Sequence, residues 1–531
     1  MGKQNYCIIK RQYGIICCVV KTYCKMQSCE DNYMAFTSFD FLLFFPVVAL
    51  AYYIVPRRFR YLWLLFAGYY FYMSWSVKYG FLLLGITVVT YCGAGALSWC
   101  GRMAEPAGSA VWQKKLCMLL LAILTFGALF FYKYFNFLAG NVNAVWSRLH
   151  YGRTIPTADL ILPLGISFYT FQAFGYLMDV YRGKTQPEKN FFRYALFLSF
   201  FPTLVSGPIE RSDNLLRQLR DAGQSVFRGE NVKKGLCLML WGYFLKLVMA
   251  ERIAVFVNAV YGQETDGVFV LLAMMLYGIQ IYCDFAGYST LAAGAAKVMG
   301  FSLVENFRAP YLSFSVSEFW RKWHMSLTGW FRDYLYIPLG GSKKGRLRKY
   351  RNIMIVFLVS GLWHGAGWKY VIWGGLNGFY QVAGELLKPL REKTIGRVWR
   401  GRAAGLRKAG SCVCTFFLVD FAWLFFRADS TGKALGMCKR LLGGFHLSAL
   451  AGGALFGFGL NQTEFAFMLL TIVLLFAVDL LHRSGRHVLE LVQAWHWVFG
   501  SCLCAALLMT VLIFGIYGVN YDVGTFIYFA F

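Results

Sequence analysis

Long apolar runs, separated by short basic or Gly- and Pro-rich connections, fill most of the chain. They lie near residues 39–55, 61–76, 79–99, 116–138, 163–181, 194–207, 235–262, 267–300, 370–387, 410–427, 464–482 and 494–517. A membrane-crossing helix needs about 20 mainly apolar residues, and continuous rather than alternating hydrophobicity favours helices over a β-barrel. Several runs are too short or too rich in Gly and Pro to cross cleanly. We therefore predict an all-α polytopic transmembrane bundle of about eleven to thirteen spans, with re-entrant and interfacial helices.

The membrane body is expected to form one domain, because residues 34–531 contain no internal repeat, low-complexity tract or long linker. Residues 1–33 differ from it. Their five basic residues would put positive charge on the opposite flank of the first span from the cluster at 57–60. One hypothesis is that translation begins at Met34, so that residues 1–33 are an N-terminal extension that is not translated or is disordered. An amphipathic extension and an unusual signal sequence are the alternatives.

Composition narrows the class further. The chain is 58% apolar and 15% charged, whereas soluble proteins have about a quarter of their residues charged. Its 53 basic and 26 acidic residues give 53 − 26 = +27. In a membrane protein this excess indicates cytoplasmic loops and attraction to anionic membrane lipid, and we expect no nucleic acid partner.

Two late loops are the most basic, at residues 343–351 and 388–408, and both should face the cytoplasm. The chain between them must leave that face and return. Asn352 to Trp363 is 12 residues, or about 18 Å of helix against a hydrocarbon core of about 30 Å. The Gly-Leu-Trp-His-Gly-Ala-Gly turn that follows is therefore predicted to place His364 at membrane depth.

Ionisable groups at membrane depth are costly and are candidates for function. His364 is flanked by glycines and by Trp363 and Trp368, and a neutral imidazole in an apolar wall can accept a proton at pH 7. His324 would share a helical face with Trp320 and Arg321, at i−4 and i−3. The alternatives are a hydrogen-bonded structural histidine at 364 and an interfacial amphipathic helix around 324.

Other candidates are less specific. Asp284 lies in a polar stripe within an apolar run, and the remaining histidines read as loop or helix-end residues: His150, His446, His482, His487 and His496. The fifteen cysteines read as small hydrophobic residues. The sequence contains no HExxH, no Cys/His cluster and no nucleotide-binding Walker loop. We therefore expect no metal and no bound cofactor.

Six stretches together resemble the membrane-bound O-acyltransferase superfamily, and within it the membrane subunits of alginate O-acetyltransferases. They are PLGISFYTFQAFGYLMDVYRG (163–183), FFPTLVSGPIER (200–211), IYCDFAGYSTLAAGAAKVMGF (281–301), FRAPYLSFSVSEFWRKWHMSLTGWFRDYLYIPLGGS (307–342), GLWHGAGWKYVIWGGLNG (361–378) and WLFFRADS (423–430). The similarity extends from Met34 to the C-terminal FIYFAF. Because such proteins tend to begin at the corresponding position, it supports the Met34 hypothesis.

The resemblance implies a helical bundle enclosing a channel in a bacterial plasma membrane, with His364 as active-site base and His324 as a second required group. It also implies a cytosolic donor, acetyl-CoA, an exported polysaccharide as acceptor and an extracytoplasmic esterase-like partner. From the residues themselves, Trp363, Trp368 or Asn377 could donate a hydrogen bond to a tetrahedral oxyanion. The residues expected to bind the acyl donor or to line the channel are these three together with Asp284, Trp320 and Arg321.

Three other functions stay open at this point. A D-alanyl transferase acting toward teichoic acid would use the same architecture with a carrier-protein thioester as donor. A lipid acyltransferase would use a long-chain donor. From a different class, a transporter or channel would use the buried His, Asp and Glu residues as a proton or solute path.

Overall fold

The computed structural model describes residues 34–103, 109–221, 226–390, 393, 404–485 and 497–517. The predicted N-terminal extension, residues 1–33, lies outside the described residues, as do His487, His496 and most of the basic loop 388–408. Within the described ranges every regular element is a helix. The predicted all-α class is therefore confirmed.

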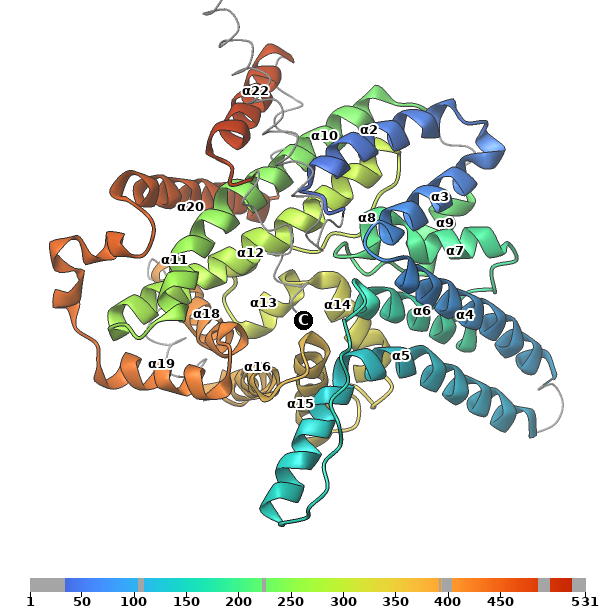
Figure 1. The fold of residues 1–531 in the computed structure, drawn as a ribbon, viewed down its shortest axis with the longest axis horizontal. Coiled ribbons are helices and arrows are strands. Elements are labelled where there is room, and N and C mark those ends of the chain that lie inside the picture. The colour runs from blue at the N-terminus through green and yellow to red at the C-terminus, as the bar shows by residue number, and fades with distance from the viewer. Residues whose placement is uncertain are drawn as a thin grey trace, which may run out of the picture.

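The first half of the chain forms long helices followed by short, broken ones (Figure 1). They are α2 (Phe39–Ile54), η1 (Arg57–Phe59), α3 (Arg60–Met73), α4 (Val77–Met103), α5 (Ser109–Arg148), α6 (Ile166–Tyr181), α7 (Phe191–Ser199), α8 (Phe201–Leu204), η2 (Ser212–Leu216), α9 (Arg217–Arg220), α10 (Gly229–Tyr243), η4 (Phe244–Ala250) and α11 (Glu251–Gly262). Here η2 and η4 are short π-helical segments.

The second half begins with the long helix α12 and then breaks into short segments at the centre of the molecule (Figure 1). Its helices are α12 (Gly267–Val298), η5 (Pro310–Leu312), α13 (Val316–Lys322), α14 (Met325–Phe331), η6 (Arg332–Tyr336), α15 (Arg346–His364), α16 (Trp368–Leu386), α18 (Ala404–Arg427), α19 (Thr431–Gly443), η8 (Leu447–Gly457), α20 (Gln462–Arg483) and α22 (Trp497–Phe514).

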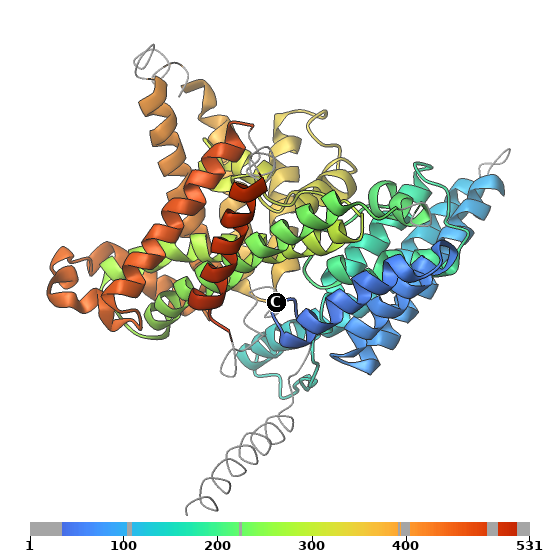
Figure 2. The same ribbon diagram turned by 90° about the horizontal axis from the view of Figure 1, so that it is seen from above.

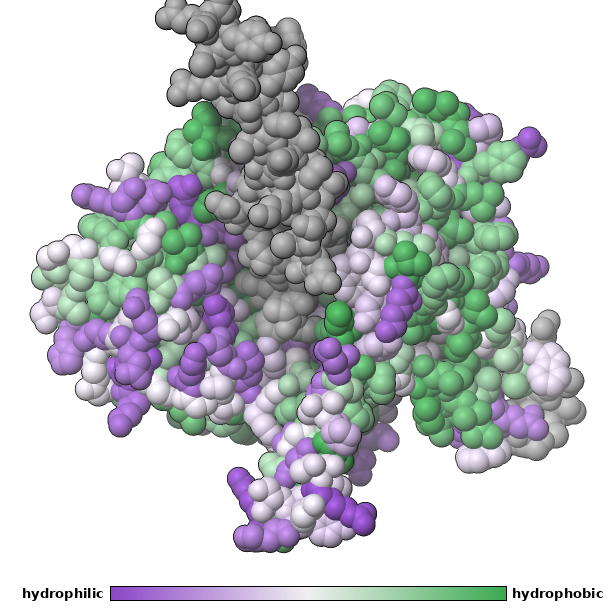
Figure 3. Space-filling model, viewed as in Figure 1, coloured by the Kyte–Doolittle hydropathy of each residue, from purple (hydrophilic) through white to green (hydrophobic). Residues whose placement is uncertain are grey.

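Five described helices are long and apolar enough to cross a membrane. They are Val77–Gly101, Val111–Arg148, Gly267–Val298, Gly405–Arg427 and Gln462–Arg483, and three shorter apolar helices accompany them. The face over α2 to α5 is largely hydrophobic in Figure 3, with large apolar side chains more than half exposed. Such a surface suits lipid rather than water. The chain is thus a helical membrane protein, and the exact number of spans stays a prediction.

Helix α12 joins two hydrophobic cores. Its Phe285 and Tyr288 belong to a core that also contains side chains of α2 to α8, whereas Tyr277 and Cys283 belong to a second core with α11, α18 and α20. Figure 2 shows α3 and α4, in blue, and α19 and α20, in orange to red, on opposite sides of the molecule. The two cores therefore meet along one buried helix.

The α15–α16 hairpin has the short turn that the sequence predicts. Helix α15 ends at His364 and α16 begins at Trp368, with only three residues between them. A Cβ atom added at Gly361 would lie 2.2 Å from the Tyr370 carbonyl oxygen, and one at Gly374 would lie 2.2 Å from that of Phe357. Only glycine fits such an approach, so these two residues allow the close packing of the hairpin.

Candidate active site

His364 lies where the two cores meet. Its side chain is 2% exposed, and its ring lies 4.9 Å from that of Trp363, 4.9 Å from that of Trp373 and 5.4 Å from that of Phe426 (centroid to centroid). Trp363 belongs to the first core, while Trp373 and Phe426 belong to the second. The imidazole is thus enclosed by aromatic side chains from α15, α16 and α18.

Helix α5 holds the end of α15 that carries His364. The Lys133 ammonium donates to the Trp363 carbonyl oxygen at 2.5 Å, and the Tyr134 hydroxyl donates to that of Leu362 at 2.7 Å. The last carbonyls of a helix have no partner within it, so these donors replace the missing hydrogen bonds. The sequence showed Lys133 only as a single charge in an apolar run, and nothing there marked Tyr134.

His324 stands between two helices rather than within one. Helix α13 ends at Lys322, Trp323 is extended, and His324 has φ +44° and ψ +54° before α14 begins. The expected shared helical face with Trp320 and Arg321 is therefore wrong, because the helix breaks before it reaches the histidine. Arg321 is exposed. A left-handed backbone at a residue other than glycine costs about 1–3 kcal/mol and persists only where surrounding contacts impose it.

The contacts that impose this conformation come from Asn306. The backbone N–H of Met325 donates to the Asn306 carbonyl oxygen at 2.9 Å, and the His324 Nδ1 lies 3.1 Å from the Asn306 Oδ1. The imidazole is fully buried, with its ring 4.6 Å from that of Phe285 and 6.4 Å from that of Phe168. Asn306 directly precedes the stretch FRAPY, and no local pattern in the sequence marks it as a functional residue.

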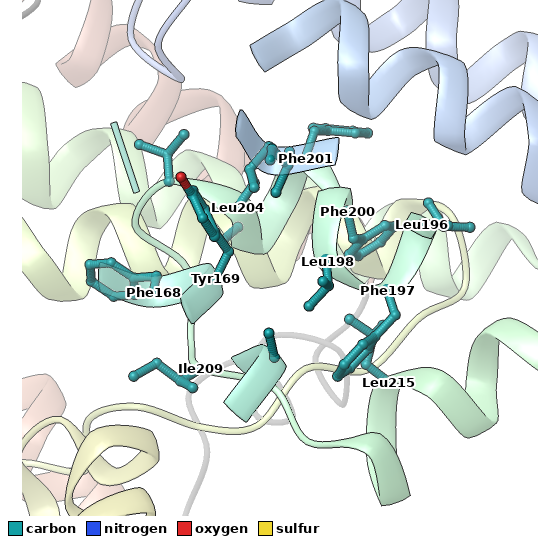
Figure 4. Close-up of a cluster of buried hydrophobic side chains, with 14 of the residues drawn as sticks. Phe168, Tyr169, Leu196, Phe197, Leu198, Phe200, Phe201, Leu204, Ile209 and Leu215 are labelled. Carbon is teal, nitrogen blue, oxygen red and sulfur yellow. The ribbon is translucent and has the colours of Figure 1, made fainter. Parts of the chain in front are cut away.

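Phe168 comes from a dense cluster of buried aromatic and aliphatic side chains. Figure 4 shows it with Tyr169, Phe197 and Phe201, contributed by α6, α7 and α8. These four side chains are at most 6% exposed. The cluster therefore gives the site a rigid wall of hydrophobic side chains.

The Trp363 side chain lies next to both histidine rings. Its indole lies 6.1 Å from the His324 ring and 4.9 Å from the His364 ring, between centroids. Within the described part of the chain, its Nε1–H is buried without a hydrogen-bond acceptor, as is that of Trp373. A buried indole N–H usually finds an acceptor, so both remain available to an oxygen atom that enters the site.

The other predicted donors are engaged elsewhere. Trp368 is 59% exposed and donates from Nε1 to Asn141 Oδ1 at 2.9 Å, on the surface of α5. Asn377 is buried, accepts from Trp320 Nε1 at 3.0 Å and donates to the Trp373 carbonyl oxygen at 2.9 Å. Asn377 and Trp320 thus hold α13 against α16, next to the aromatic wall of His364.

Asp284 is part of a buried ion cluster. The Lys246 ammonium lies 2.6 Å from its Oδ1 and also contacts the Glu251 carboxylate. All three residues are less than 9% exposed. The structure therefore assigns this carboxylate an ionic contact with η4, whereas the next residue, Phe285, lies against His324. Over the described ranges, no three His, Cys, Asp or Glu side chains gather as a metal site would require.

Comparison with known proteins shows the family of the chain. A model of the membrane-bound O-acyltransferase family matches residues 187–419, which include both histidines. A probable alginate O-acetylase of Pseudomonas putida is 34% identical over 429 residues, which cover 80% of this chain and 81% of the relative. A peptidoglycan O-acetyltransferase of Helicobacter pylori is 33% identical over 431 residues, covering 75% and 78%.

A teichoic acid D-alanyltransferase of Bacillus subtilis matches a smaller part. It is 30% identical over 235 residues, which cover 41% of this chain and 58% of the relative. The extensive matches and the family model agree on one assignment. The chain belongs to the membrane-bound O-acyltransferase family and is an O-acyltransferase.

Proposed function

We propose that this enzyme transfers acetyl groups from cytosolic acetyl-CoA, through a channel in a bacterial plasma membrane, to hydroxyls of an exported polysaccharide. The observation that carries the proposal is the meeting of two buried histidines at Trp363. The O-acetylase and O-acetyltransferase relatives match about four fifths and three quarters of the chain, which favours acetyl transfer to a glycan.

In the proposed reaction, His364 acts as the general base. It takes the proton of the acceptor hydroxyl while the hydroxyl oxygen attacks the thioester carbonyl. The Trp363 and Trp373 indoles donate to the resulting oxyanion. When the intermediate collapses, the carbon–sulfur bond breaks, and the departing thiolate receives the proton from the His364 imidazolium. The products are the acetyl ester and free coenzyme A.

The basic segment 343–351 is the proposed docking surface for the phosphates of the donor. Lys343, Lys344, Arg346 and Arg348 are exposed, and no ion pair engages them among the described residues. They lie at the start of α15, whose 19 residues span about 28 Å to His364 at its other end. One helix thus connects an anion-attracting surface with the proposed base.

The acceptor and the partner complete the proposal. We assign the acceptor hydroxyls to a polysaccharide outside the membrane, reached with the help of an extracytoplasmic esterase-like protein. The support is the family resemblance and the glycan-modifying relatives. Expression of the chain with and without such a partner should show whether acetylation of the glycan requires the partner.

The direct test is substitution of His364. His364→Ala should lower acetyl transfer by about a hundred- to ten-thousandfold, because the general base that accepts the hydroxyl proton is lost. The amount of enzyme in the membrane should stay the same. His482→Ala serves as control, since that residue lies at the exposed end of α20. Full acetylation of the exported glycan by His364→Ala would overturn the proposal.

A panel of thioesters tests the donor. When it is given an acceptor with hydroxyl groups, purified enzyme should release coenzyme A from acetyl-CoA and should discriminate against long-chain acyl-CoA. The teichoic acid D-alanyltransferase relative makes D-alanyl-carrier thioester the informative competitor. If the enzyme prefers that donor, the proposed reaction becomes D-alanyl transfer, and the proposed roles of the histidines stay the same.

A further inference from the structure

The buried side chain of Asn306 forms a hydrogen-bond network next to His324. Asn306 Oδ1 has three neighbours with which it can share a hydrogen: the Ser326 backbone nitrogen at 3.3 Å, the Ser326 Oγ at 2.9 Å and the His324 Nδ1 at 3.1 Å. Asn306 Nδ2 lies 3.1 Å from the Ser289 Oγ. Asn306, His324, Ser326 and Ser289 are each less than 9% exposed, so these hydrogen bonds are shielded from solvent.

One member of this network has a fixed role. A backbone N–H can only donate, so the atom of Asn306 that faces the Ser326 nitrogen must be the carbonyl oxygen. This orients the amide, whose Nδ2 then donates to Ser289. The Ser326 hydroxyl accepts from the backbone N–H of Ile209 at 3.1 Å, which leaves its own hydrogen for Asn306 Oδ1.

The same oxygen determines the state of the imidazole. An amide oxygen carries no hydrogen, so a hydrogen bond to His324 Nδ1 requires the proton to be on Nδ1. In a neutral imidazole the other nitrogen, Nε2, then has the free electron pair. Nε2 is on the ring edge directed away from Asn306, in a ring that also contacts Trp363.

We propose that Asn306 is a positioning residue, which holds His324 as the Nδ1–H tautomer and so makes its Nε2 a hydrogen-bond acceptor for the reacting groups. This inference rests on the proposed function for the identity of those groups. The tautomer itself does not depend on it. The partners of a functional histidine commonly fix its tautomer and orientation in this way.

Two further features support the role of Asn306 in positioning His324. The left-handed backbone at His324 is stabilised by the Asn306 carbonyl oxygen through Met325, so one residue fixes both the backbone and the ring. In addition, Ser289 belongs to α12 and Ile209 to the segment before η2. The network therefore joins three distant parts of the chain at a single histidine.

The first test reads the tautomer without any activity measurement. The full chain is labelled with ¹⁵N-histidine, reconstituted in lipid and examined by solid-state NMR, with His324 assigned by difference against His324→Gln and His324→Asn. We expect a protonated Nδ1 and an unprotonated Nε2 near neutral pH. A protonated Nε2 with a bare Nδ1 would overturn the proposal.

Substitution of Asn306 provides the second test. Asn306→Asp keeps an acceptor for all three donors, and its carboxylate favours a doubly protonated ring, so NMR should show protons on both nitrogens. Asn306→Ala removes the acceptor, and a mixture of tautomers is expected. The matched control is Asn352→Asp, which changes another buried asparagine. Asn352 lies in α15 and donates to the carbonyl oxygens of Leu339 and Gly341. In this variant the His324 signals should not move.

Kinetics then connects the tautomer to turnover. Both Asn306 variants should lower kcat by about 10- to 100-fold, the range found for residues that orient metal-ligating histidines, with little change in KM for acetyl-CoA. Unchanged kcat in a variant whose tautomer has changed would refute the positioning role. If the wild-type enzyme shows the expected tautomer but transfers no acyl group from any thioester, the proposed function is wrong. The conclusion that Asn306 holds His324 as the Nδ1–H tautomer would still stand.

Discussion

The clearest distinction at the scale of single residues is between two tryptophans that the sequence could not separate. Trp363 and Trp368 both flank His364 in the chain, and both were candidates for donating to an oxyanion. The structure buries Trp363 against both histidines, whereas Trp368 is 59% exposed and bonded to Asn141. The difference arises because α15 ends at His364, and the chain turns before Trp368.

Substitution of each indole by phenylalanine should therefore have different effects. Trp363→Phe preserves an aromatic ring but removes the buried N–H, and kcat for acetyl transfer should fall by about 100-fold, the lower end of the range for loss of one oxyanion donor. KM for acetyl-CoA should change little. Trp368→Phe, the matched control, should leave both constants unchanged. Equal activity of the two variants would exclude Trp363 as a donor.

At the scale of elements, the position of His364 depends on a contact between α5 and the end of α15. Tyr134→Phe removes the hydrogen bond to the Leu362 carbonyl oxygen. Loss of such a bond should lower the free energy of unfolding by about 1 kcal/mol, because the carbonyl is left without a partner. Thermal unfolding of purified enzyme measures this effect. The control is the substitution of a nearby tyrosine, Tyr132→Phe. An equal loss of stability in that variant would argue against a specific role for the hydrogen bond between Tyr134 and Leu362.

A second element contact is sensitive to pH. Asp266, at the start of α12, accepts from the backbone N–H groups of Val268 and His446 and from the His446 ring at 2.7 Å. These hydrogen bonds lower the pKa of the Asp266 carboxyl from 3.8 to about 2. Because the folded-state pKa is lowered, the ionised form stabilises the fold above pH 3.8, and this stabilisation is lost as the pH falls through about 2.

Asp266→Asn should consequently lower the melting temperature at pH 7. The difference from wild type should stay constant down to about pH 5 and shrink between about pH 4 and pH 2, where the wild-type carboxyl becomes protonated. Melting curves across this range measure the effect. Asp159→Asn, at an exposed position outside the helices, provides the comparison. A difference that grows on acidification would contradict the assignment.

At the scale of the whole molecule, the buried cluster of Lys246, Asp284 and Glu251 lies where α12 meets η4 and α11. Lys246→Met would leave two carboxylates buried without their cation, which should destabilise the fold by about 3–5 kcal/mol. Yield and thermal stability after purification measure the loss. The triple variant Lys246→Met, Asp284→Asn, Glu251→Gln should recover most of it, and failure to do so would indicate a functional rather than electrostatic requirement.

The sequence alone determined the class of the molecule, because hydrocarbon requires long apolar helices and these are visible as runs of residues. It also selected His324 and His364, since an ionisable residue among tryptophans and glycines stands out locally. Tertiary structure decided how the site is built. Asn306, Lys133 and the wall of Phe168 reach the histidines from distant segments, and such convergence depends on helix packing that no local pattern encodes. The break at His324 has the same cause, because its left-handed backbone is held by hydrogen bonds from outside the helix.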